Sequence, residues 1–143
     1  MTPSKLCALL GCTTLVAGDI WSDCSSSVAH LKNLNVSITP DPPVKGVKLN
    51  IGITGTLDED LTAGSLNVWI KFLGIKIVNK HYDLCAEAAK TDTPCPIAAG
   101  AFNISIPESI PEATPTGHYL GQVSMADPKG EEVTCIDLDF KLH

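Results

Sequence analysis

The stretch TCIDLDFKL, residues 134–142, alternates between two kinds of side chain along its whole length. One set is Thr134, Ile136, Leu138, Phe140 and Leu142, and the other is Cys135, Asp137, Asp139 and Lys141. Successive side chains of a β-strand point to opposite faces, so this alternation predicts a strand with one buried face. The stretch SLNVWIKF, residues 65–72, repeats the pattern, and we expect it to direct Leu66, Val68, Ile70 and Phe72 inward.

Further alternating stretches lie on either side of residues 65–72, separated by clusters of Pro, Gly and Asp. Their inward-facing sets are Val47, Leu49, Ile51 and Ile53 in one stretch and Phe102, Ile104 and Ile106 in another, with a further strand over 118–126. The motif Asp127-Pro128-Lys129-Gly130 has the composition of a hairpin turn. We therefore predict an all-β fold, a sandwich of two antiparallel sheets with no long helix.

The chain of 143 residues has the length of one domain. Residues 1–18 place Lys5 before an apolar run and finish with small residues, which is the layout of a cleavable signal peptide. We expect a mature domain over 19–143 that is secreted or held in the lumen of an endosome, lysosome or vacuole.

Four cysteines lie outside the predicted signal peptide: Cys24, Cys85, Cys95 and Cys135. An even number of cysteines on an oxidising route predicts two disulfides. The four lack the close paired spacing of a zinc site, so we expect no bound metal. Three pairings are possible. The favoured one joins Cys24 to Cys135, tying the start of the domain to its last strand, and Cys85 to Cys95, pinning a local loop.

The charge and the sequons bear on the compartment and on the partners. Asn35 and Asn103 each begin an Asn-x-Ser sequon and are candidate glycosylation sites. The formal net charge of −6 argues against nucleic acid as a partner. The chain contains no arginine, so it lacks the side chain that grips phosphate with two parallel hydrogen bonds.

No motif in the chain indicates catalysis. The four histidines are scattered and belong to no recognised nucleophile, metal or phosphate motif. Aromatic residues make up 5% of the chain, too few for the platforms of a sugar-binding cleft. The acidic run Asp58-Glu59-Asp60 lacks the ligand spacing of an EF-hand and is better interpreted as a solvated turn. We therefore predict a protein that is not an enzyme and needs no cofactor.

The inward-facing Ile, Leu, Val and Phe side chains allow two interpretations. In an ordinary sandwich they interdigitate between sheets about 10 Å apart and form a close-packed core. The same residue types would also line an open slot for an acyl chain or a sterol. Periodicity does not separate these alternatives.

A set of motifs in fixed order resembles the ML lipid-recognition domain. The set includes Asp83-Leu84-Cys85, Cys95-Pro96-Ile97, the stretch from Pro115 to Tyr119 (PTGHY), and Val133-Thr134-Cys135. The segments NVS (35–37), PPVKG (42–46) and GSL (64–66) occur in the expected order as well. The resemblance runs from about Asp23 to Phe140. It is closest to fungal phosphatidylglycerol/phosphatidylinositol transfer proteins and plant secreted ML proteins, and more distant from the secreted Niemann-Pick type C sterol carrier.

The resemblance implies an immunoglobulin-like sandwich whose sheets are splayed around a lipid tail, with a disulfide from first to last cysteine. By strand parity, the lipid-facing residues would be Leu49, Ile51, Ile53, Val68, Ile70, Phe72, Tyr119, Val123, Ile136, Leu138 and Phe140. The entrance would lie near Ile77, Val78, Ile97, Phe102, Ile106 and Ile110. The third disulfide and the aromatic gate of the animal sterol carrier have no counterparts here, so a preference for sterol does not carry over.

The function implied by the resemblance is passive carriage of one lipid, a phospholipid or a sterol, between membranes. The expected partners are that lipid and, transiently, membrane surfaces, with the protein itself a monomer. Two alternatives remain open: a secreted module that presents lipid to a receptor, and an adhesion sandwich with a filled core.

Overall fold

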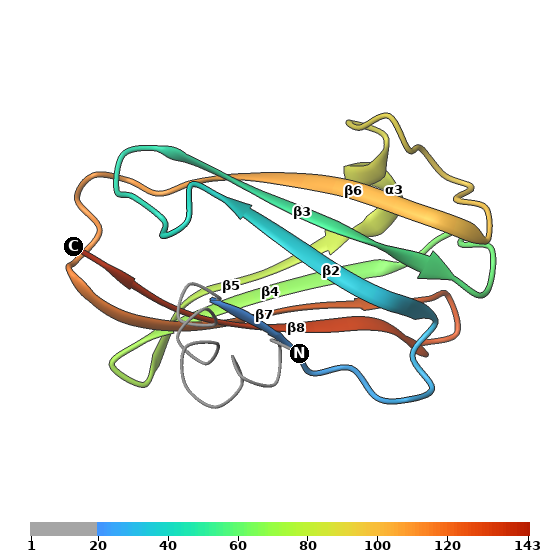
Figure 1. Ribbon diagram of the computed structural model, residues 1–143, viewed down its shortest axis with the longest axis horizontal. Coiled ribbons are helices and arrows are strands. Elements are labelled where there is room, and N and C mark those ends of the chain that lie inside the picture. The colour runs from blue at the N-terminus through green and yellow to red at the C-terminus, as the bar shows by residue number, and fades with distance from the viewer. Residues whose placement is uncertain (1–19) are drawn as a thin grey trace, which may run out of the picture.

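The computed structural model describes residues 20–143, and these form two antiparallel sheets that pack face to face (Figure 1). Sheet A has the strand order β1 (Trp21–Asp23), β8 (Glu132–Leu142), β7 (Gly117–Ala126), β4 (Ser65–Phe72) and β5 (Ile75–Asp83). Sheet B has the order β2 (Leu31–Thr39), β3 (Lys48–Leu57) and β6 (Gly100–Ser109). The predicted β-sandwich is confirmed. The predicted signal peptide, residues 1–18, lies outside the described residues.

The single core forms where the inner faces of the two sheets meet, as the alternating patterns predict. Val68 of β4, Val123 of β7 and Ile136 of β8 are directly paired across sheet A, so their side chains share one face. Ile136 of β8 and Ile53 of β3 are both fully buried between the sheets. The hairpin turn at 127–130 is also confirmed, because the Asp127 carboxylate accepts hydrogen bonds from the backbone N–H groups of Lys129 and Glu131.

One helix, α3 (Leu84–Ala88), follows β5 and is capped by Asp83, whose carboxylate accepts from the N–H groups of Cys85 and Ala86. Within residues 20–143, no helix is long and apolar enough to cross a membrane.

The β4–β5 hairpin departs from strict alternation. Leu73 and Gly74 make a two-residue turn with φ of 54° and 79°, the left-handed geometry that suits a tight hairpin. Ile70 pairs with Val78 but Lys71 pairs with Lys76, so Ile77 has no partner and forms a bulge. Half of the Ile77 surface is exposed (50%). Its place at the entrance of a lipid slot stays a prediction.

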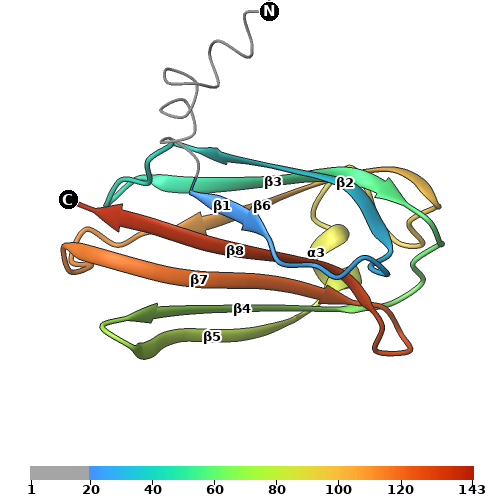
Figure 2. The ribbon, with the colours of Figure 1, turned by 60° about the horizontal axis from the view of Figure 1, so that its bottom comes forward.

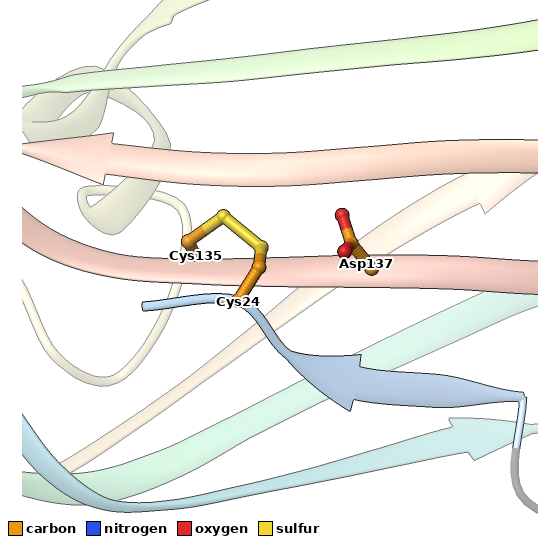
Figure 3. Close-up of side chains that lie close together, drawn as sticks. All are labelled: Cys24, Cys135 and Asp137. Carbon is orange, nitrogen blue, oxygen red and sulfur yellow. A yellow bond between two sulfur atoms is a disulfide. The ribbon is translucent and has the colours of Figure 1, made fainter. Parts of the chain in front are cut away.

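The two sheets are joined along the side where β1 and β8 approach β2. The segment 24–30 crosses from sheet A to sheet B there, and the Cys24–Cys135 disulfide fastens its start to β8 (Figure 3). The N–H of Cys24 donates to the carbonyl of Cys135, and the N–H of His30 donates to the carbonyl of Glu132. The second disulfide joins Cys85 to Cys95, so both favoured pairings are present.

The opposite side of the sandwich has a different character. There β5 and β6 are the outer strands of their sheets, and each pairs with only one neighbour (Figure 2). The sandwich therefore has one side fastened at β8 and one side with two free strand edges, which, within residues 20–143, only α3 and the cysteine loop bridge.

We expect the two disulfides to contribute unequally to stability. The Cys24–Cys135 bridge spans 111 residues and the Cys85–Cys95 bridge spans 10. Loop entropy in the unfolded chain then predicts losses of about 5 and about 3 kcal/mol when each pair is replaced by serine. Denaturant unfolding of the two double variants measures the difference, and a larger loss from the short loop would contradict this account.

Candidate functional site

A cleft of about 450 Å³ lies between the free edges of β5 and β6. This volume falls within the range of about 300–1,000 Å³ that is usual for small-molecule sites. Three elements line the cleft. They are β5 with Lys80 and Tyr82, α3 and the residues after it with Glu87, Lys90 and Thr91, and β6 with residues 104–109.

The base of the cleft is apolar and continuous with the core. Ile104 and Ile106 are buried on the inner face of β6, where they pair with Ile53 and Ile51 of β3. Tyr82 is half-buried and packs against the same core from β5. A ligand in the cleft would therefore meet the side chains that fill the space between the sheets.

The rim of the cleft is charged. Lys80 of β5 pairs with Val68 of β4, whose side chain faces inward. The Lys80 side chain therefore also lies on the inner face of sheet A, at the free edge of that sheet. Lys90, after α3, lies 3.2 Å from the Glu87 carboxylate and is largely exposed. The cleft thus combines an apolar base with a rim of mixed charge, in which the Lys80 and Lys90 ammonium groups lie beside the carboxylates of Glu87 and Glu108. This arrangement suits a molecule with an apolar part and a polar end.

Three aromatic rings form a row on the inner face of sheet A, away from α3. Tyr119 stacks between Phe72 and Phe140, with ring centroids 4.7 and 5.5 Å apart. The Tyr119 hydroxyl donates to the carbonyl of Pro115 at 2.6 Å, and burial raises the pKa of Tyr119. A Cβ at Gly117 would lie 2.7 Å from the Phe72 ring, so this glycine lets the ring approach. The stretch from Pro115 to Tyr119 therefore positions the whole row.

The model of the ML domain family matches residues 18–142 of this chain. This chain belongs to the ML domain family. The match covers both sheets, both disulfides and the cleft.

Similar proteins agree with this membership. A Dictyostelium discoideum protein provisionally named phosphatidylglycerol/phosphatidylinositol transfer protein 2 is 40% identical over 91% of this chain and 90% of its own length. The phosphatidylglycerol/phosphatidylinositol transfer protein of Candida albicans is 36% identical over 79% of this chain and 60% of its own length.

Solved structures share the fold at low sequence identity. The Niemann-Pick type C2 protein from Japanese carpenter ant aligns with a TM-score of 0.67 at 16% identity, covering 87% of this chain and all of that one. Chicken MD-1, crystallised in complex with lipid IVa, aligns with a TM-score of 0.64 at 16% identity over 85% of this chain and 86% of its own.

The structure gathers most of the sequence-predicted lipid-facing residues into the core of this ML domain. Eight of them are buried there: Leu49, Ile51, Ile53, Tyr119, Val123, Ile136, Leu138 and Phe140. Val68, Ile70 and Phe72 are partly buried and pack against the same core. Their contact with lipid stays a prediction, because burial is equally what a filled core requires.

The predicted entrance residues do not stay together. Ile106 lines the cleft, and Phe102 is buried two residues before Ile104 on β6. Ile97 is 2% exposed and pairs with Leu61 beside the cysteine loop, and Ile110 packs partly buried after β6. Apart from Ile106, the cleft-lining residues were absent from the predicted set. Val78, Lys80 and Tyr82 do alternate inward, but the bulge at Ile77 and the charge of Lys80 concealed that pattern.

Both sequons lie on the outer face of sheet B. Asn35 and Asn103 each pair with Thr54, on its two sides, which places them in one cross-strand row, and both are exposed. This face is the opposite one from the core. A glycan at either asparagine would leave the inner face of the sheet unobstructed, so glycosylation stays a prediction that the geometry permits.

A histidine surrounded by carboxylates closes the far end of the sandwich, where β3 and β7 end. His30 Nδ1 lies 2.6 Å from Asp58, and His30 Nε2 lies 3.0 Å from Glu131, 3.6 Å from Glu59 and 3.7 Å from Asp127. Hydrogen bonds to Glu131 and then to Asp58 raise the pKa of His30 above its usual 6.5, and burial raises the pKa of Glu59. The network ties sheet B to the β7–β8 turn of sheet A.

We expect this network to make stability depend on pH. Because the pKa of His30 is raised in the folded protein, its contribution is full below about pH 6.5 and is lost as the pH rises through the folded value. His30→Gln should therefore reduce the free energy of unfolding more at acidic than at alkaline pH, by about 0.5–1 kcal/mol. Thermal or urea unfolding at several pH values measures this.

His81→Gln is the matched control, because His81 Nδ1 contacts the neutral amide oxygen of Asn67. If both variants follow the wild-type pH profile, the His30 network contributes no pH dependence.

Proposed function

We propose that this ML domain binds the apolar tail of one lipid between its two sheets, through the cleft at the β5 and β6 edges, and carries it between membranes. The observation that carries the proposal is the continuity between the cleft and the core at Ile104 and Ile106. A tail that enters there replaces contacts between the sheets with contacts to itself, while the sandwich stays fastened along β1, β8 and β2.

The energetics favour exchange without a chemical step. Burial of a tail is favourable by about 25 cal/mol per Å² of apolar surface, and leaving a bilayer costs a similar amount. Transfer between membranes can then run close to equilibrium and needs no catalytic group. This agrees with the absence of a recognised catalytic motif in the sequence, and we propose that the protein is not an enzyme.

We favour a phospholipid with an anionic head group over a sterol. The similar proteins of Dictyostelium discoideum and Candida albicans carry the name phosphatidylglycerol/phosphatidylinositol transfer protein. At the rim, Lys80 offers a positive charge for a phosphate at the mouth of the cleft, and Lys90 can offer a second one when it exchanges its contact with Glu87 for the phosphate. Because the chain has no arginine, the phosphate would contact only lysine ammonium groups, which act as point charges. Such contacts suit a head group that remains in solvent.

The two disulfides are consistent with an oxidising environment. We propose secretion or residence in an endosomal, lysosomal or vacuolar lumen, with the protein acting as a monomer. In an acidic lumen the His30 network would make its full contribution to stability.

The first test is native mass spectrometry of the disulfide-intact protein, followed by extraction and identification of any lipid that co-purifies. We expect one phospholipid per chain, and accelerated movement of labelled phosphatidylglycerol between vesicles. A protein that purifies empty and moves no lipid would overturn the proposal and favour a sandwich with a filled core.

A variant that fills the cleft tests the route. Ile106→Trp puts a large indole ring at the base of the cleft. Transfer should fall about tenfold or more, which is the effect of a ligand that no longer fits an apolar pocket. Thr56→Trp puts the same ring on the exposed outer face of sheet B, outside both sequons, and should leave transfer unchanged. Equal transfer by both variants would exclude the cleft as the route.

A further inference from the structure

All but one of the exposed large hydrophobic side chains of residues 20–143 lie at one end of the molecule. The exposed set is Val28, Val44, Val47, Leu73, Ile75, Ile77 and Leu120. All except Val28 lie in the β2–β3 loop, in the β4–β5 hairpin or near the start of β7. The antiparallel strands bring these three places to the same end, which we call the hairpin end (Figures 1 and 2). Single exposed apolar residues are ordinary, but their concentration at one end marks an interaction surface.

The β4–β5 turn is the most exposed part of this surface. Leu73 is 80% exposed and Ile75 is 68% exposed. Leu73 also holds a left-handed backbone conformation, which asparagine or glycine adopts more readily. The chain thus places a large apolar side chain at a turn position where the backbone favours a small polar residue.

Amphipathic side chains stand directly behind the turn. The Nζ atoms of Lys71 and Lys76 lie 5.1 and 5.3 Å from the centroid of the Trp69 ring. An indole beside ammonium groups, next to exposed leucine and isoleucine, is typical of the boundary between hydrocarbon and head groups in a bilayer. A membrane surface requires apolar side chains at the turn with basic side chains behind them, whereas a protein partner does not require this order.

The charges of the molecule are polarised along the same axis. The far end carries Asp58, Glu59, Asp127 and Glu131 around His30. The hairpin end carries Lys71 and Lys76 on the β4–β5 hairpin, although the whole chain has a net charge of −6. In the neighbouring β2–β3 loop, Lys45 and Lys48 lie near Asp41 and Glu112, so the positive charge is concentrated at the hairpin itself. An anionic surface would attract the hairpin end and repel the far end.

We propose that the hairpin end docks onto anionic bilayers, with Leu73, Ile75 and Ile77 entering the acyl region and Lys71 and Lys76 contacting lipid phosphates. This inference rests on the proposed lipid transfer and adds the surface through which the protein meets the membrane. The β5 strand runs from the docked turn to Lys80 and Tyr82 at the cleft, so docking brings the free sheet edge close to the bilayer.

Flotation with vesicles tests the surface. The probes are vesicles of mixed phosphatidylglycerol and phosphatidylcholine, and vesicles of phosphatidylcholine alone. The variant Leu73→Gly with Ile75→Thr keeps residues that suit the turn and the strand, creates no glycosylation sequon, and removes apolar surface. We expect it to lose about tenfold or more in affinity for the mixed vesicles. Val28→Thr, at the other end, removes a side chain of comparable exposure and should bind as the wild type does.

The charge contribution is tested separately. Lys71→Gln with Lys76→Gln should lower affinity for the mixed vesicles about tenfold or more, and much less for phosphatidylcholine alone. Lys129→Gln, in the β7–β8 turn at the far end, is the control. Trp21→Phe leaves Trp69 as the one indole in residues 20–143. When this variant binds vesicles, the emission of Trp69 should shift to shorter wavelength relative to the same variant without vesicles.

Capture of short-chain phosphatidylglycerol from solution separates docking from lipid binding. Variants that keep capture but lose flotation support the proposal. It is overturned if the hairpin variants float like the wild type, if Val28→Thr loses as much affinity, or if the wild type captures lipid but never floats. It is also overturned if the hairpin variants abolish self-association of the wild type in sedimentation while flotation stays unchanged, because the surface then joins copies of the chain.

Discussion

The unequal fastening of the two sides of the sandwich is the constraint on which the rest of the structure depends, because, in the part of the chain that the structure describes, α3 and the cysteine loop alone bridge the side opposite β1 and β8. The Cys24–Cys135 disulfide and the short crossing from β1 to β2 hold sheet A to sheet B at β8. The opposite side ends in β5 and β6, which have no further strand to pair with. A sandwich built in this way can separate at the free side while the fastened side keeps the register of the strands, and the cleft lies at the free side.

The same core side chains therefore serve both the stability of the fold and the proposed contact with lipid. Burial of residues such as Ile53 and Ile136 stabilises the fold, and the same apolar surface is what a lipid tail would contact. The aromatic row of Phe72, Tyr119 and Phe140 stiffens the inner face of sheet A, because Tyr119 is also held by its hydrogen bond to Pro115. A rigid sheet A facing the smaller sheet B concentrates any opening at the β5 and β6 edges.

The charged clusters of the molecule lie mainly at the two ends of the sandwich. At the far end, His30 and its carboxylates link the two sheets and respond to pH. At the hairpin end, lysines surround exposed apolar side chains. Between them, Lys80 and Lys90 mark the mouth of the cleft. This distribution orders the molecule along its long axis, and it explains how an acidic chain can present a locally basic surface.

The sequence by itself determined the sandwich, several of its strands, the hairpin turn at 127–130 and most of the core, because two-residue periodicity and turn chemistry are local properties. It left three disulfide pairings possible and favoured the one that the structure has. It also carried the family, through motifs such as Pro115 to Tyr119, whose packing role with Phe72 the structure explains. Only the tertiary structure decided where the cleft lies. A single unpaired residue, Ile77, shifted the parity of β5, and the cleft is formed by β5, α3 and β6, which no local pattern relates. The His30 network and the hairpin end were likewise undetermined, because they join residues that lie far apart along the chain and meet only when the strands are aligned.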